Sequence, residues 1–108
     1  MAKYVVFFRF KGETIKGLID HPSDRAAVVR GLAEQVGGSM ECYYLMFGQY
    51  DGFTVVDVPD SAAAAAISLA VSSSGTLAHV ETHELIAADD LGGLLEKAGS
   101  LTYQAPGT

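Results

Sequence analysis

The sequence HVETH, at residues 79–83, contains the residue types that come nearest to a metal site or a proton-transfer pair. Imidazole and carboxylate groups bind zinc and also exchange protons with substrates. On a strand, however, His79 and His83 lie roughly 13 Å apart at about 3.3 Å per residue, which is too far for one ion to bind both. A metal site would therefore need Glu81, one histidine and a group from another strand, and no metal is predicted. For acid–base chemistry, His79 with either Glu81 or Asp57 is the only candidate pair.

Arg9 and Asp57 are charged residues within otherwise apolar strands. An arginine in apolar surroundings can anchor a carboxylate or an enolate, and we expect Arg9 to form an ion pair with Asp57 across adjacent strands. Cys42 has no evident base near it in sequence and is interpreted as a buried apolar residue. No catalytic residue and no cofactor is predicted. The predicted ligand-binding residues are Arg9, Tyr43, Tyr50, Asp57, His79 and Glu81.

The elements that position these residues follow from hydrophobic patterning and turn residues. We expect strands at 3–10, 39–47, 53–58 and 76–86, and helices at 22–36, 61–74 and 89–98. Segment 11–22 is polar, contains glycine and is interpreted as a connection. Asp20 or His21 before Pro22 is expected to start the first helix, Asp60 the second, and Asp89 or Asp90 the last.

This order of elements, β-α-β-β-α-β, predicts an α+β fold of the ferredoxin-like type. Its four strands form one antiparallel sheet with both main helices on one face, followed by an extra C-terminal helix. The chain is expected to be one domain over residues 1–108, with a core at 3–88 and the C-terminal helix and tail at 89–108.

The predicted sheet has one face without helices, which we call the open face. Strand 39–47 is ambiguous because both of its faces are apolar, and we place its odd-numbered residues on the open face. Burying each large apolar side chain is worth roughly 1.5–3 kcal/mol, so a second copy is expected to cover this face, giving a homodimer or a larger homo-oligomer. The predicted open face comprises Val5, Phe7, Arg9, Glu41, Tyr43, Leu45, Phe47, Phe53, Val55, Asp57, His79, Glu81 and His83.

The composition indicates which kinds of partner and which cellular location are expected. The 108 residues carry a net charge of -6 without any basic run, which argues against binding nucleic acid or anionic membranes. The single cysteine excludes a disulfide scaffold. The apolar run in MAKYVVFFRF is too short for a signal peptide, and the apolar stretch 62–71 is about half a membrane span. A cytoplasmic location is therefore expected.

The segment GQYDGF, at 48–53, reads as a hairpin turn because Asp51-Gly52 separates two strand-like runs. Tyr50 is the residue that such a turn does not require. GQYDGFTVVDVPD resembles the signature of the GYD domain family, and the likeness extends over most of residues 3–88. Gly48, Tyr50, Asp51 and Gly52 match the hallmark positions, with Gln49 between Gly48 and Tyr50. The resemblance implies a dimeric α/β barrel, in which two ferredoxin-like sheets face each other, and implies no particular reaction.

Three functions are compatible with these features. The first is a dimeric small-molecule-binding or regulatory protein with its ligand between facing sheets. The second is a cofactor-independent enzyme, monooxygenase-like or isomerase-like, which rests on fold analogy alone. The third is a structural assembly module in which the charges only satisfy one another. A cavity between the sheets would separate the first two from the third, and a histidine within hydrogen-bond reach of a carboxylate would favour the enzyme.

Overall fold

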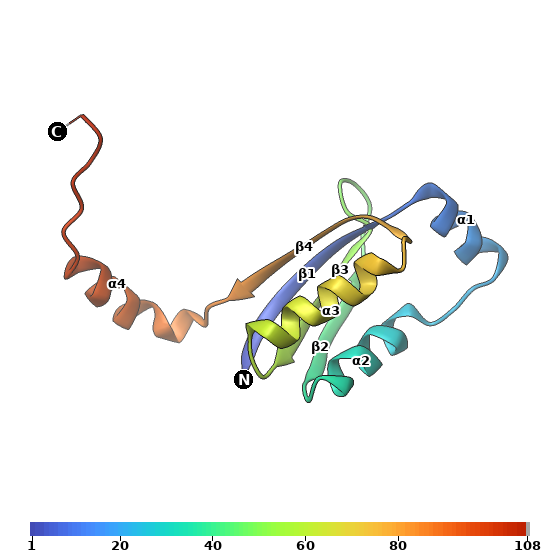
Figure 1. The fold of residues 1–108 in the computed structure, drawn as a ribbon, viewed down its shortest axis with the longest axis horizontal. Helices are drawn as coiled ribbons and strands as arrows, with labels where there is room; N and C mark the ends of the chain where they lie inside the picture. Colours follow the sequence, from blue (N-terminus) through green and yellow to red (C-terminus); the bar gives the residue numbers. More distant parts are fainter. Residues whose placement is uncertain (108) are drawn as a thin grey trace.

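The computed structural model describes residues 1–107 and confirms the ferredoxin-like α+β fold (Figure 1). Its four strands form one antiparallel sheet in the order β2-β3-β1-β4. The elements in chain order are β1 (Ala2–Phe10), α1 (Gly12–Asp20), α2 (Arg25–Gln35), β2 (Ser39–Leu45), β3 (Gly52–Val58), α3 (Ser61–Ser73), β4 (Leu77–Leu85), the 3-10 helix η1 (Ala88–Asp90) and α4 (Leu91–Gly99).

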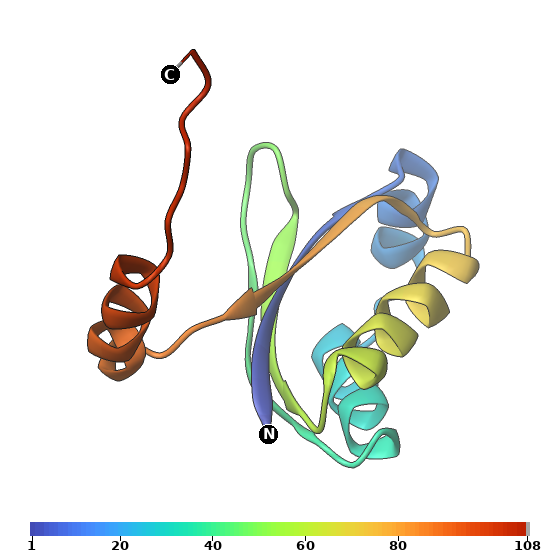
Figure 2. The same cartoon turned by 60° about the vertical axis from the view of Figure 1, so that its left-hand side comes forward.

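Helices α1, α2 and α3 all lie on one side of the sheet, as Figure 2 shows. Side chains alternate along β1 and β3, so that one set is buried beneath these helices and the other is only half-buried on the open face. The predicted separation of Phe7, Phe53 and Val55 from the helix side is therefore confirmed. The buried core between the sheet and α2 and α3 consists of Tyr4, Ala33, Val56, Val58, Ala64 and Ile67.

Side-chain caps begin both main helices. The Asp60 carboxylate accepts a hydrogen bond from the backbone of Ala63 (2.9 Å) and starts α3, as predicted. The expectation that Asp20 or His21 starts the preceding helix at Pro22 is wrong. Asp24 is the N-cap of α2, and its carboxylate accepts from the Ala27 backbone at 3.0 Å. An aspartate that can reach an unsatisfied helical N–H stabilises the helix start more than a nearby proline does.

Part of segment 11–22 is helix α1, which the sequence pattern did not reveal. Nine residues with two glycines carry little intrinsic helix propensity, so a connection was the natural prediction. Contacts with the residue that precedes β4 hold the helix in place: the Lys11 N–H and the Thr14 hydroxyl both donate to the carbonyl of Thr76, at 3.1 and 2.7 Å. Tertiary hydrogen bonds therefore compensate for the weak local preference.

Strand β2 contains an irregularity that corrects the predicted face of Tyr43. The register with β3 shifts between Met40 and Cys42, so Tyr43 lies opposite Thr54 and Tyr44 opposite Phe53. Thr54 is buried on the helix side, and Tyr43 accordingly stacks on Phe8 of that side (5.4 Å between ring centroids). A bulge inserts one extra residue and reverses the alternation beyond it.

The same shift moves Leu45 to the helix side, opposite Gly52, and β2 ends there instead of at Phe47. Phe47 lies in the loop that follows and is fully exposed. The predicted open-face placement of Leu45 is therefore wrong, and Phe47 belongs to no strand.

The C-terminal part of the chain, residues 86–107, extends away from the sheet and carries η1 and α4 (Figure 1). Every described residue from Glu84 onward is exposed. Asp90 occupies the predicted N-cap position of α4, but its side chain makes no capping hydrogen bond. Within residues 1–107, no helix combines the length and the apolar character that a membrane crossing needs.

Candidate functional site

The central feature of the open face is the column of residues that β1 and β4 place opposite one another. Antiparallel pairing sets Arg9 against His79, Phe7 against Glu81 and Val5 against His83. Directly opposed side chains on one face lie about 4.5–5.5 Å apart at their Cβ atoms. Because side chains alternate between the two faces along β4, His79, Glu81 and His83 lie on the same face, as predicted.

Glu81 accepts hydrogen bonds from three side chains. Nε2 of His79 donates to one carboxylate oxygen (3.0 Å), and Nε2 of His83 donates to the other (3.1 Å). The Tyr50 hydroxyl donates to the oxygen that His79 also contacts. An ionised carboxylate can only accept, so both histidines must carry a proton on Nε2.

These hydrogen bonds change the pKa values of Glu81 and Tyr50. The Tyr50 hydrogen bond, followed by those of His83 and His79, lowers the pKa of Glu81 to about 2. The same hydrogen bond to Glu81, together with partial burial, raises the pKa of Tyr50 above its ordinary value. At neutral pH the arrangement is therefore a fixed carboxylate with a neutral phenol.

Tyr50 reaches this carboxylate from the loop between β2 and β3. Its ring lies over Phe7 (5.4 Å between centroids) and stacks against His79 (6.1 Å). Gly48, at a φ of 127°, gives this loop a backbone conformation that other residues rarely adopt. The residue that the turn itself does not require is thus the one that connects the hairpin to β4.

Asp51 and Gly52 fix the position of that loop. The Asp51 carboxylate accepts the backbone N–H of Phe10 (2.8 Å), and the Asp51 N–H donates to the carbonyl of Phe8 (2.9 Å). A Cβ added at Gly52 would come within 2.5 Å of the Phe8 ring and 2.6 Å of the Tyr44 carbonyl oxygen. Each residue of the Gly-Tyr-Asp-Gly pattern therefore has a separate structural or site role.

Aromatic side chains form the surface around the carboxylate. Phe7 and Phe53 lie 6.0 Å apart, and Tyr44 stacks on Phe53 at 5.6 Å. Tyr44 is 60% exposed, and Cys42, which lies opposite Val55, is half-buried. Sequence reasoning missed both Tyr44 and Cys42 as open-face residues, and no signal in the apolar strand could have revealed the bulge.

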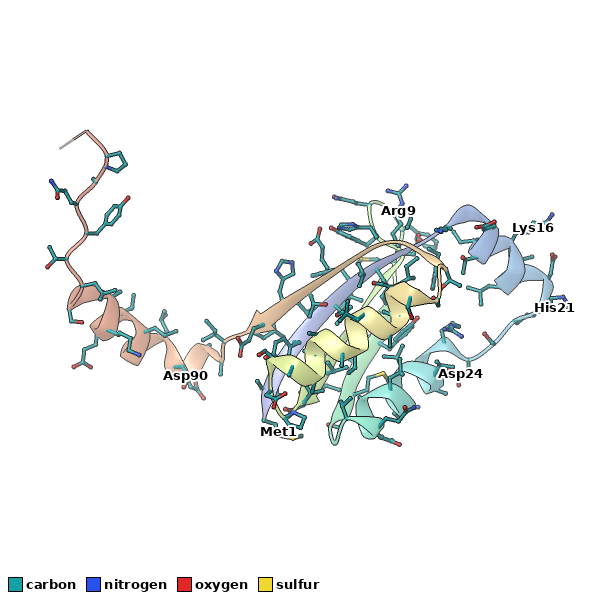
Figure 3. The ribbon with its side chains drawn as sticks, in the orientation of Figure 1. Met1, Arg9, Lys16, His21, Asp24 and Asp90 are labelled. Atoms are coloured by element: carbon teal, nitrogen blue, oxygen red, sulfur yellow. The ribbon has the colours of Figure 1, made fainter. Side chains whose placement is uncertain are left out.

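The structure separates Arg9 from Asp57. Strand β1 runs antiparallel to β3, so Asp57 lies opposite Lys3, six residues along the strand from Arg9. The predicted ion pair between Arg9 and Asp57 is therefore wrong. Figure 3 places Arg9 at the end of the sheet where the β2–β3 loop lies. Lys3 instead pairs with Glu41 (2.8 Å), while Oδ1 of Asp57 is buried without a hydrogen-bond partner.

The predicted ligand-binding residues thus divide into three groups. Tyr50, His79 and Glu81 meet in one cluster, with Arg9 beside His79 at its edge. Asp57 shares the face but lies at its far end, and Tyr43 lies on the opposite side of the sheet. His83 joins the cluster although it was not among the predicted binding residues, and its period-two spacing from Glu81 was the available signal.

Within residues 1–107, no group of three histidine, cysteine, aspartate or glutamate side chains is arranged to hold a metal ion. The cluster can accept hydrogen bonds through Glu81 and exchange protons through two imidazoles, each with a second ring nitrogen, Nδ1. We call Tyr50, His79, Glu81 and His83 the Glu81 cluster.

This geometry defines the class of protein. It is a ferredoxin-like α+β domain with a polar cluster on its open face. The profile of the GYD domain family matches residues 4–95, and the chain belongs to that family. The matched range contains every residue of the Glu81 cluster and of the loop that positions Tyr50.

One solved structure of low sequence identity has a similar fold. The crystal structure of TTHA0845 from Thermus thermophilus is similar at a TM-score of 0.53 and 17% identity, covering 82% of this chain and 96% of that one. An uncharacterized NIPSNAP domain protein from Burkholderia xenovorans matches at a TM-score of 0.47 and 15% identity, covering 82% and 95%. No curated protein matches the chain.

Proposed function

We propose that this GYD protein is a homodimer that binds a small molecule between two facing open faces. The observation that carries the proposal is the Glu81 cluster, a fixed carboxylate with three donors beside the aromatic side chains of the sheet surface. Ligand sites commonly combine apolar walls with a few convergent polar groups that orient the ligand. Arg9, opposite His79, adds a cation at the edge of the same surface.

The apolar side chains of the open face support the proposal that a second copy of the chain packs on it. Val5, Phe7, Phe53 and Val55 remain half-buried, because α1, α2 and α3 lie on the other side of the sheet and α4 extends beyond the sheet. Burial of such side chains is worth roughly 1.5–3 kcal/mol each when complete, so their partial exposure favours association. We further propose a cytoplasmic location, supported by the single cysteine, Cys42.

The C-terminal segment supports the same arrangement. Figure 2 shows α4 on the side of the sheet opposite α1, α2 and α3. Its Leu91 and Leu95 are 55% and 61% exposed, and α4 ends beyond the sheet rather than on it. A second copy on the open face would provide a surface for these leucines.

The oligomeric state tests the dimer. Light scattering coupled to size-exclusion chromatography should give twice the chain mass of 11.3 kDa at micromolar concentration. Phe53→Glu, which places a charge in the middle of the face, should give a monomer. Leu69→Glu serves as the control, because Leu69 is 70% exposed on α3, away from the open face. A monomeric wild type, or identical behaviour of both variants, would contradict the proposal.

Native mass spectrometry of the purified dimer tests the ligand. We expect a co-purified small molecule whose occupancy falls in Glu81→Gln, since the amide cannot reproduce the charged acceptor. Glu41→Gln is the matched control, because Glu41 is exposed and pairs only with Lys3 among the described residues. A wild-type dimer without bound mass that also binds nothing from a metabolite extract would favour the structural assembly module.

A cofactor-independent enzyme, monooxygenase-like or isomerase-like, is the second candidate. It is supported by the hydrogen bonds of His79 and His83 to Glu81, because an oriented imidazole can act as a general base. The ligand recovered from the dimer distinguishes the two functions. An enzyme would convert this compound on incubation and lose turnover in His79→Gln and His83→Gln, whereas a binding protein would return it unchanged.

A further inference from the structure

A cavity of about 220 Å³ lies on the helix side of the sheet, within a single chain. Its floor is formed by Val6 and Phe8 of β1, and its walls by side chains of α2 and α3 such as Val29 and Val71. Val6 and Phe8 are each 6% exposed, yet they lie outside the continuous core cluster. Val56 and Ile67 of the core also line the cavity, which therefore lies directly beside the core.

The small side chains of α3 account for this cavity. Beyond Ile67, which is buried, the helix and its C-cap present Ala70 and Ser74 to the cavity. Alanine and serine cannot fill the distance between a helix and a sheet, so α2 and α3 enclose space at this end instead of closing it.

Arg25 is the charged residue among the side chains that line this cavity. It is the first residue of α2 and is half-buried, and its guanidinium has no ion pair or hydrogen bond within the part of the chain that the structure describes. The neighbouring carboxylate of Asp24, labelled at the start of α2 in Figure 3, is occupied by the Ala27 N–H as a helix cap.

Two other polar side chains of the lining already have partners in the chain. The Thr54 hydroxyl donates to the Cys42 carbonyl (2.8 Å), and the Ser74 hydroxyl donates to the Val71 carbonyl (2.6 Å). Burial raises the pKa of Tyr43, and the positive charge of Arg25 opposes that rise, which places the guanidinium within electrostatic reach of the phenol. Among residues 1–107, Arg25 and the nearby Tyr43 hydroxyl are thus the lining groups left to bind a ligand, and Arg25 is the charged one.

The cavity connects to the surface at this end. Arg25 and Phe10 also line two more open grooves beside α1, of about 450 and 700 Å³. The guanidinium of Arg25 therefore lies where the apolar cavity adjoins these grooves.

We propose that this cavity binds a small apolar carboxylate, with its hydrocarbon body between α2 and α3 and its carboxylate on the guanidinium of Arg25. Arginine forms strong, paired hydrogen bonds with carboxylates. A dry apolar cavity of about 150 Å³ already holds benzene, so 220 Å³ suits a single substituted ring or a short alkyl chain. The site lies on the opposite side of the sheet from the Glu81 cluster and does not require a dimer.

Titrations of the full chain with benzoate and with its neutral isostere benzamide, followed by two-dimensional amide NMR, test the proposal. We expect saturable benzoate shifts that centre on α2 and α3, and benzamide binding about tenfold weaker because the charge-assisted hydrogen bonds are lost. Hexanoate should compete with benzoate for the same amides.

Arg25→Gln should weaken benzoate about tenfold and leave benzamide unchanged. Arg30→Gln, on the exposed part of the same helix and outside the cavity lining, should change neither. Val71→Leu, which fills part of the cavity, should weaken both ligands while preserving the amide spectrum. Equal affinity for benzoate and benzamide, no effect of Arg25→Gln, or shifts confined to β4 and the β2–β3 loop would overturn the proposal; the last result would place the ligand at the Glu81 cluster.

Discussion

The Glu81 carboxylate accepts hydrogen bonds from one phenol and two imidazoles. The phenol contributes most to the low pKa of Glu81, about 2. Tyr50 comes from the GYD motif, and Glu81 comes from the HVETH segment 31 residues later in the chain. The hairpin motif and the HVETH segment are therefore parts of one cluster. His79 and His83 are four residues apart on β4, and both of their side chains converge on the carboxylate between them.

Tyr50→Phe tests this coupling. Removal of the hydroxyl should raise the pKa of Glu81 from about 2 toward the ordinary range of a glutamate, because the largest stabiliser of the carboxylate is lost. Carbon-detected NMR titration of the Glu81 carboxyl measures the shift. Tyr44→Phe, an exposed tyrosine that stacks on Phe53, should leave this pKa unchanged.

The stability of the fold should also depend on pH through Glu81. Its pKa is lower in the folded state than its ordinary value of 4.5, so the stabilisation is fully present above that value and is lost as pH falls toward 2. Urea midpoints measured between about pH 5 and pH 2 should fall less steeply in Glu81→Gln than in the wild type. Parallel curves would mean that the cluster contributes nothing to folding.

At the scale of elements, the start of β3 and the β2–β3 loop are held by close packing on β1. Gly52 lies under the Phe8 ring, and Asp51 ties the loop to the backbone of Phe10. The hairpin is thus positioned by β1 as much as by its own turn residues. These contacts therefore also position Tyr50 of the same loop, which reaches across the sheet to Glu81.

Gly52→Ala should therefore destabilise the fold by about 1–3 kcal/mol, because the new methyl group has no space between Phe8 and the Tyr44 carbonyl. Denaturant unfolding measures the change. Gly31→Ala in α2, where a methyl group meets no atom within 4 Å, should instead stabilise by about 0.5–1 kcal/mol. The same loss at both sites would show that close packing is not the cause.

At the scale of the whole molecule, the two sides of one sheet carry the two proposed sites. The open face carries the Glu81 cluster, and the helix side encloses the Arg25 cavity. The C-terminal segment extends the molecule to 58 Å in its longest dimension. An extended arm with exposed leucines is costly for an isolated chain in water and is consistent with the proposed dimer.

Leu95→Asp tests the role of the arm. Leu95 is 61% exposed in the single chain, so the stability of the monomer fold should change little. The dimer should dissociate at higher protein concentration than the wild type, which sedimentation velocity measures. Glu96→Gln, on the same exposed helix, should leave the dissociation constant unchanged; an unaffected Leu95→Asp dimer would remove the arm from the interface.

The sequence by itself determined the β-α-β-β-α-β order of the strands and the two main helices, the capping of α3 by Asp60 and the faces of β1, β3 and β4. These features depend on local periodicity and on side chains that bond to nearby backbone groups. Only the tertiary structure decided the face of Tyr43, the separation of Arg9 from Asp57 and the existence of α1. A bulge in a strand that is apolar on both sides leaves no periodic signal, and antiparallel register depends on which strands become neighbours. Helix α1 is held by hydrogen bonds to Thr76, which is 62 residues beyond Thr14 in the chain, and no local pattern records such a contact.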